Sequence, residues 1–298
     1  MDQSIAILRS IIKHTRVEEL LFRFRRAEGP QSSFYSTLPT ASIGNQNTDL
    51  PLVDNITTLR IDCGHCTRVS DTGGLYLNVL IANCTRLVRL EVNLEMACPQ
   101  VFEPTLVEGN TVNLPLEHLF MRGIRDGLSQ PGIFSRHLRR LKTFGFQAPP
   151  YRNDDVSWSL MAQYKIWPTQ LYVRPHVELG SSAFFQYLKD HPGLESLYYI
   201  ESLTNGAGED DASTLQGLLT ALVPRHVDTL KELELFDSST SWALSWPGHP
   251  DATETMKNQL GQLSSLRRFA IRIDWSMHRD FCPSNGVSIF CSMIYLVG

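Results

Sequence analysis

The sequence carries no strong excess of charge of either sign. Its 27 basic and 31 acidic residues leave a formal net charge of −4 at pH 7. A protein that binds nucleic acid or an anionic membrane surface usually shows a basic patch or a basic overall balance. The composition therefore predicts neither nucleic acid nor a membrane surface as a partner.

Long apolar runs and cysteines are also scarce. The longest apolar run, 287–297, is interrupted by serines and is shorter than the roughly 20 residues that cross a bilayer. The first residues, Met1 to Ser4, do not open a signal peptide. Six cysteines in 298 residues do not make a dense disulfide framework. These absences predict a reducing compartment, the cytoplasm or the nucleus.

Motifs of known catalytic chemistry are missing as well. The sequence contains no glycine-rich phosphate loop and no Gly-x-Ser-x-Gly turn, and its nine histidines are scattered. We therefore expect no enzyme activity and no cofactor.

What the sequence does contain is a repeated spacing of apolar residues. Each copy has an apolar residue, a second one three positions later and a third one two positions after that. Successive copies start about 31 residues apart on average, close to the period of leucine-rich repeats. The copies are Val17-Leu20-Phe22, Ile56-Leu59-Ile61, Leu87-Leu90-Val92, Leu116-Leu119-Met121, Leu141-Phe144-Phe146, a weaker Pro168-Leu171-Val173, Leu194-Leu197-Tyr199, Leu230-Leu233-Leu235 and Leu266-Phe269-Ile271.

This spacing predicts a short strand in every copy. Residues two apart point to the same side of a strand, and the first apolar residue can enter the same core where the chain turns into the strand. One such unit cannot cover its own apolar face, so neighbouring units must stack. The predicted fold is an α/β leucine-rich-repeat solenoid, a horseshoe or arc of about 8–9 irregular strand–helix repeats with a parallel concave sheet. It covers residues 1–275, with a surface loop over 25–55.

Several segments between the strands show helical spacing. They are 156–166, 181–190, 213–223 and 253–263. From Trp275 onward the repeat stops, and we expect residues 276–298 to form an irregular C-terminal tail. One closing strand is the alternative for this segment.

One stretch, between Ile56 and Val92, has a more specific pattern. Cys66 is followed by Val69-Ser70-Asp71, then by Gly74-Leu75, and then by Cys84 before the next apolar triplet. This resembles the cysteine-containing leucine-rich repeat of F-box proteins. The whole chain is similar to the fungal F-box and leucine-rich-repeat proteins, which are ribonuclease-inhibitor-like in fold. The resemblance implies the substrate-recognition part of a ubiquitin-ligase receptor.

The F-box itself is not found between Met1 and Leu50. The resemblance therefore implies a ubiquitin-ligase adaptor as partner only through an F-box outside this chain. The alternative is a free-standing leucine-rich-repeat scaffold that has no association with a ligase.

Cys63-Gly64-His65-Cys66 raises a different possibility, because protein disulfide isomerases use the same tetrapeptide. Thiol–disulfide exchange through Cys63 and Cys66 is the distant alternative function. However, the carboxylate of Asp62 would raise a neighbouring thiol pKa, which disfavours the reactive thiolate. A zinc site that adds His65 and Cys84 rests on a single Cys-x-x-Cys pair, so we expect no metal.

The residues between the apolar strand positions should point out of the core, onto the concave face. Aromatic and arginine side chains gather there, and these types are enriched in protein interfaces. We predict that a protein partner binds this face; the alternative is that its aromatics pack against each other or against a crossing loop. The predicted contact residues are Arg60, Glu91, Phe120, Arg122, Tyr172, Arg174, Tyr198 and Glu234.

Overall fold

The chain forms two compact units, Met1–Leu141 and Lys142–Gly298 in the computed structural model, and each is described by itself. Of the surface loop expected over 25–55, only Asn55, an exposed turn residue, is described. The residues that the structure describes are 18–23, 55–62, 81, 84–93, 114–123, 137–147, 155–174, 182–201, 211–237, 258–274 and 290–295.

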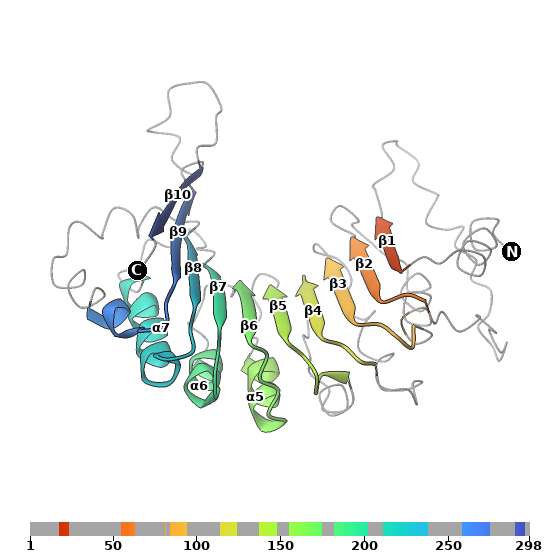
Figure 1. Ribbon diagram of the computed structural model, residues 1–298, viewed down its shortest axis with the longest axis horizontal. Helices are drawn as coiled ribbons and strands as arrows, with labels where there is room; N and C mark the ends of the chain where they lie inside the picture. The colour runs from red at the N-terminus through yellow and green to blue at the C-terminus, as the bar shows by residue number, and fades with distance from the viewer. Residues whose placement is uncertain are drawn as a thin grey trace, which may run out of the picture. The chain divides into compact units, whose positions relative to one another are not determined.

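The first unit contains four parallel strands in chain order (Figure 1). In β2, β3 and β4, the second and fourth residues are buried and the others are partly exposed. This alternation is what the apolar spacing predicts, because successive side chains point to opposite faces of a strand. The strands are β1 (Glu19–Arg23), β2 (Thr58–Asp62), β3 (Arg89–Asn93) and β4 (His118–Arg122).

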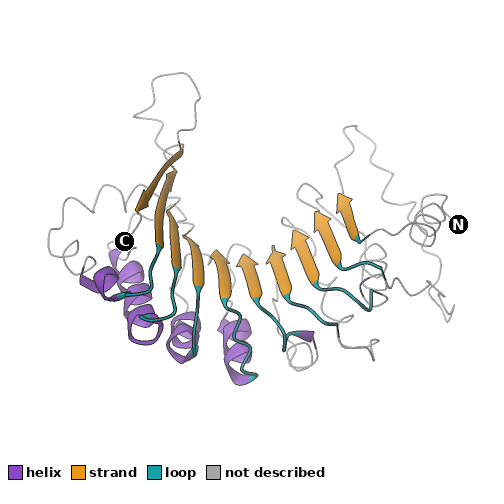
Figure 2. Ribbon diagram, viewed as in Figure 1, coloured by secondary structure: helices purple, strands orange, loops and turns teal. Residues whose placement is uncertain are grey.

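The second unit adds five parallel strands and the described helices (Figure 2). The chain is thus of the α/β class, as predicted, and in neither unit do the strands close into a barrel. The elements are β5 (Thr143–Gln147), α5 (Asp155–Gln163), β6 (Gln170–Arg174), α6 (Ser182–Asp190), β7 (Ser196–Glu201), α7 (Asp211–His226), β8 (Glu232–Asp237) and β9 (Arg268–Asp274).

The register of the strands confirms the apolar spacing. Leu59 pairs with Leu90, which pairs with Leu119, and all three are at most 1% exposed. In the second unit Leu171, Leu197 and Leu233 pair in the same way and are fully buried. The weaker copy is confirmed too, since Pro168, Leu171 and Val173 are buried.

A recurring backbone contact fixes this register. Within each unit, the carbonyl just before a strand accepts from the next copy of the repeat, in most copies from two consecutive N–H groups; Lys142 O accepts from Gln170 N at 3.0 Å. Thr57 O accepts from Val88 N at 2.8 Å and Arg89 N at 2.9 Å. In the second unit, Glu195 O accepts from Lys231 N at 2.8 Å and Glu232 N at 3.1 Å. Within each unit, these turns are therefore held by the turn of the preceding copy.

The helices of the second unit cover one side of its strands. Trp158 of α5 is fully buried and contacts Phe144 of β5 with ring centroids 5.7 Å apart. Phe184 of α6 lies 4.7 Å from Trp158 and 6.1 Å from Tyr199 of β7. Because the buried strand residues face the helices, the alternate strand residues point to the opposite side.

Two helix ends differ from the prediction. The prediction ended this helix at 166, but α5 ends at Gln163. Two residues later, Lys165 takes a left-handed conformation with φ 56°, which terminates the helix. α7 runs past Pro224, where we expected it to stop, and ends at His226. The buried His226 ring bonds to Leu188 O at 2.9 Å, so tertiary contacts hold the last turn despite the proline.

The expectation of an irregular tail over 276–298 is wrong for part of that segment. Phe290–Tyr295 forms β10, which pairs antiparallel with β9. The alternative of one closing strand is the correct one. This strand follows no repeat period because it runs opposite to the repeat strands, and its backbone supplies partners for the edge of β9 that would otherwise stay unpaired.

A core substitution tests the repeat. We expect Leu197→Ala to lower the free energy of unfolding by about 3 kcal/mol, because it leaves a cavity under β7. The matched control is Val156→Ala on α5, where the side chain is 55% exposed and the expected change is within about 0.5 kcal/mol. Urea unfolding followed by circular dichroism measures both, and equal values for the two variants would contradict the assigned core.

Candidate partner-binding face

The predicted contact residues all lie on what we call the sheet face. We define it as the first, third and fifth strand positions, which alternate with the buried ones. In the first unit Arg60, Glu91 and Phe120 pair in register, with Arg122 two residues further along β4. In the second unit Tyr172, Tyr198 and Glu234 pair in register, with Arg174 at the end of β6. The predicted row of middle positions is thus confirmed within each unit.

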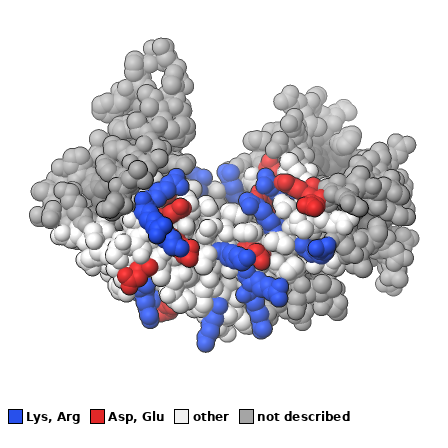
Figure 3. Space-filling model, viewed as in Figure 1, with Lys and Arg blue, Asp and Glu red and all other residues white. Residues whose placement is uncertain are grey.

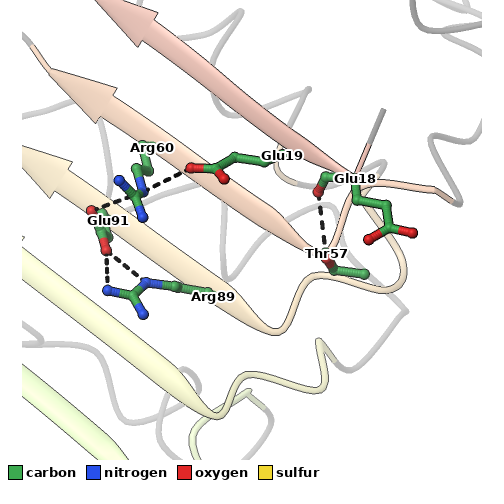
Figure 4. A network of polar contacts seen from close by, with 6 residues as sticks. All are labelled: Glu18, Glu19, Thr57, Arg60, Arg89 and Glu91. Carbon is green, nitrogen blue, oxygen red and sulfur yellow. Dashed lines mark hydrogen bonds and ion pairs between the residues drawn. The ribbon is translucent and has the colours of Figure 1, made fainter. Parts of the chain in front are cut away.

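Charged side chains of the first unit form a connected network (Figure 4). Arg60 of β2 lies between two carboxylates, with Nε 3.1 Å from Glu19 Oε1 and 3.3 Å from Glu91 Oε2. Arg89 Nε donates to Glu91 Oε1 at 2.6 Å. Arg60 Nε itself makes no well-oriented hydrogen bond, so its attraction to the two carboxylates is mainly coulombic.

The same network reaches the aromatic residue of β4. The Arg89 guanidinium lies 5.2 Å from the centre of the Phe120 ring, a cation–π distance. These side chains are substantially exposed, Arg60 by 42% and Arg89 by 38%. Ion pairs this exposed contribute roughly 0–1 kcal/mol each. The network therefore orients the side chains of the face more than it stabilises the fold.

Two stacked tyrosines mark the second unit. The Tyr172 and Tyr198 rings are 4.2 Å apart and parallel to within 1°. The expectation that aromatics of this face pack against each other is correct for this pair, although both side chains stay half-buried. Tyr198 donates its hydroxyl hydrogen to Glu232 Oε2 at 2.6 Å. Burial, and then the Glu232 carboxylate, raise the pKa of Tyr198 well above its usual range.

Other contacts complete the face of the second unit. Arg268 Nη2 lies 3.5 Å from Glu234 Oε2, and Thr143 donates to Gln170 Oε1 at 3.0 Å. Gly145 belongs to the middle row but is buried, since without a side chain it does not project beyond its neighbours. The projecting groups are thus concentrated on β6, β7 and β8.

The sequence prediction missed the first row of the face. The first strand residues Glu19, Arg89, Glu232 and Arg268 each contact a predicted residue. The signal was available, because positions two apart share a face of a strand. Charges of both signs lie close together over the described surface, as Figure 3 shows.

The cysteine alternatives gain no support from the described residues. Cys63, His65 and Cys66 lie outside them. Cys84 is fully buried and unpaired by disulfide, and burial raises its thiol pKa to about 12. A protonated buried thiol is a poor nucleophile and a poor zinc ligand. Within the described part of the chain, no three metal-ligating side chains are grouped together.

Buried histidines connect neighbouring copies of the repeat. His226 Nδ1 accepts from Leu194 N at 3.2 Å while Nε2 faces Leu188 O at 2.9 Å. His191 Nδ1 accepts from Gly193 N at 3.2 Å while Nε2 faces Pro168 O at 3.0 Å. Both rings must therefore be neutral with the proton on Nε2, because a proton on Nδ1 would point at an amide hydrogen.

Burial lowers the pKa of both rings, for His191 to about 4 from an ordinary 6.5. The 5.6 Å approach of the rings adds repulsion if both become charged. In the first unit, His137 accepts from Leu114 N at 3.1 Å in a similar way. These three histidines are buried and bond to the backbone.

We expect an acid-dependent loss of stability from this arrangement. Below pH 6.5 the unfolded chain binds protons that the folded His191 does not, so the free energy of unfolding falls as the pH drops from about 6.5 to about 4. At about pH 4, His191 accounts for a loss of about 3 kcal/mol in the free energy of unfolding. Urea unfolding across this range measures it. His191→Gln keeps a donor and an acceptor and should flatten the slope; an unchanged slope would contradict the assignment.

No protein-family model matches this chain, and neither a curated protein nor a solved structure does. Among the described residues, no helix has both the length and the apolar character needed to cross a membrane. The residues of the sheet face and their contacts are therefore the basis for a functional proposal.

Proposed function

We propose that this chain is a leucine-rich-repeat solenoid that binds a protein partner through its sheet face. The repeated triplet, the parallel strands in register and the recurring carbonyl contact before each strand support this fold. They are what stacked units with a shared core require.

The stacked tyrosines are the observation that carries the binding proposal. Tyr172 and Tyr198 project from the centre of adjacent strands on the side away from the helices, and they remain half-buried rather than covered. Tyrosine supplies a large, rigid contact area together with a polar hydroxyl group. Arg174 and Glu234 on the same face add charged contacts around them, and Arg60, Glu91, Phe120 and Arg122 form the corresponding surface of the first unit.

A link to a ubiquitin ligase rests on the sequence resemblance between Ile56 and Val92. Of the residues that carry this resemblance, Cys84 is described, and it is fully buried. Other residues of that motif, Cys66 and Gly74-Leu75 among them, lie outside the described residues. We propose that the sheet face recognises the substrates of a ubiquitin ligase. The alternative is that the chain is a free-standing scaffold.

Replacing both tyrosines tests the binding proposal. We expect Tyr172→Ala/Tyr198→Ala to lower affinity for a partner at least tenfold, because a central aromatic contact is lost. The free energy of unfolding should change by only about 1 kcal/mol, since the tyrosine pair lies outside the core. Affinity purification of the full chain with quantitative mass spectrometry, with Val156→Ala as control, identifies partners that depend on the tyrosines.

The same purification separates the two uses. Enrichment of a ligase adaptor and a cullin with the chain supports the ligase proposal, and their absence among tyrosine-dependent partners favours the scaffold. Partners that bind equally well to the double variant would overturn the sheet face as the binding site.

A further inference from the structure

Glu232 is a carboxylate that no described cation pairs with. It opens β8 on the sheet face and is half-buried. Its side-chain contact is with the neutral hydroxyl group of Tyr198, at 2.6 Å. Lys231 pairs with Glu195 at 3.0 Å. Arg268 lies opposite Glu232 in the register of β8 and β9, but its Nη2 lies 3.5 Å from Oε2 of Glu234.

The charges around Glu232 leave this part of the face negative. Glu232 and Glu234 lie two positions apart on β8, and Arg268 on β9 compensates one of them. A half-buried carboxylate attracts a cation more strongly than an exposed one, because water screens it less. The Glu232 carboxylate, which no described cation pairs with directly, is therefore the one of these two that can take a cation from a ligand.

The tyrosine next to Glu232 adds a second feature that favours a cation. The Tyr198 hydroxyl holds one carboxylate oxygen, which fixes the orientation of Glu232 beside the aromatic pair. A carboxylate offers about four acceptor positions, so one hydroxyl donor leaves room for a further donor pair. Aromatic rings attract cations, and a guanidinium can both stack on a ring and donate to a carboxylate.

We propose that the protein partner places an arginine side chain on Glu232, beside Tyr198. This rests on the proposal that the sheet face binds a protein. Arginine fits better than lysine because its planar guanidinium has several donors in one plane and lies flat against a ring. Glu232 is thus a specificity-determining residue, and the partner segment is basic.

Selection of displayed peptides on the full chain tests this. The probe is a random library of peptides of about twelve residues, and we expect the selected peptides to share an arginine at one position. Glu232→Gln, which keeps the shape and the acceptor oxygen, should weaken their binding roughly tenfold. Citrulline in place of that arginine, which removes only the charge, should weaken binding to the natural chain by a similar factor.

The two changes must not be additive if the groups meet. The citrulline peptide should bind the Glu232→Gln variant and the natural chain with equal affinity. The control variant is Glu195→Gln, in the turn before β7, and it should bind the arginine peptide and the citrulline peptide with the same affinities as the natural chain does. Peptides that need Tyr172 and Tyr198 but are insensitive to Glu232→Gln would overturn this inference and leave the proposed function intact. If no selected peptide depends on the tyrosines, both proposals fail.

Discussion

The contact on which the rest of the structure depends is the backbone hydrogen bond that joins one turn to the next. Within each unit, the carbonyl before a strand accepts from the following copy, and Thr57 and Glu195 each accept two N–H groups. This contact keeps neighbouring strands in register, so residues at equivalent positions of the two strands lie opposite each other. A shift by one residue would turn every apolar side chain to the wrong face. Both the core and the sheet face therefore follow from one repeated geometry.

Register also explains how the face acquires its chemistry. Side chains directly opposite each other in neighbouring parallel strands lie about 4.8 Å apart. Two tyrosines at equivalent positions consequently stack, and glutamate and arginine at neighbouring positions pair. Arg60 meets Glu91 in this way, and Tyr172 meets Tyr198. These contacts hold the side chains of the face in defined positions relative to one another.

Buried cysteine and histidine side chains precede several of the apolar triplets. Just before the first apolar residue of a copy, the chain places Cys84, His137, His191 or His226, and all four are buried. A histidine here can bond to the backbone of a neighbouring copy, whereas the cysteine simply fills space.

The sequence by itself determined the strands, their order and most of their buried residues, although Thr143, Gly145, Ser196 and Ala270 of the sheet face are buried as well. Those properties depend on spacing within one copy, so even the weak triplet Pro168-Leu171-Val173 could be placed. Long-range contacts decided the rest. α7 continues past Pro224 because His226 is anchored in the neighbouring copy, and β10 forms because β9 leaves an edge to pair with. The Tyr198–Glu232 bond joins residues 34 positions apart, and no local pattern specifies it. Only the folded sheet brings those two groups together.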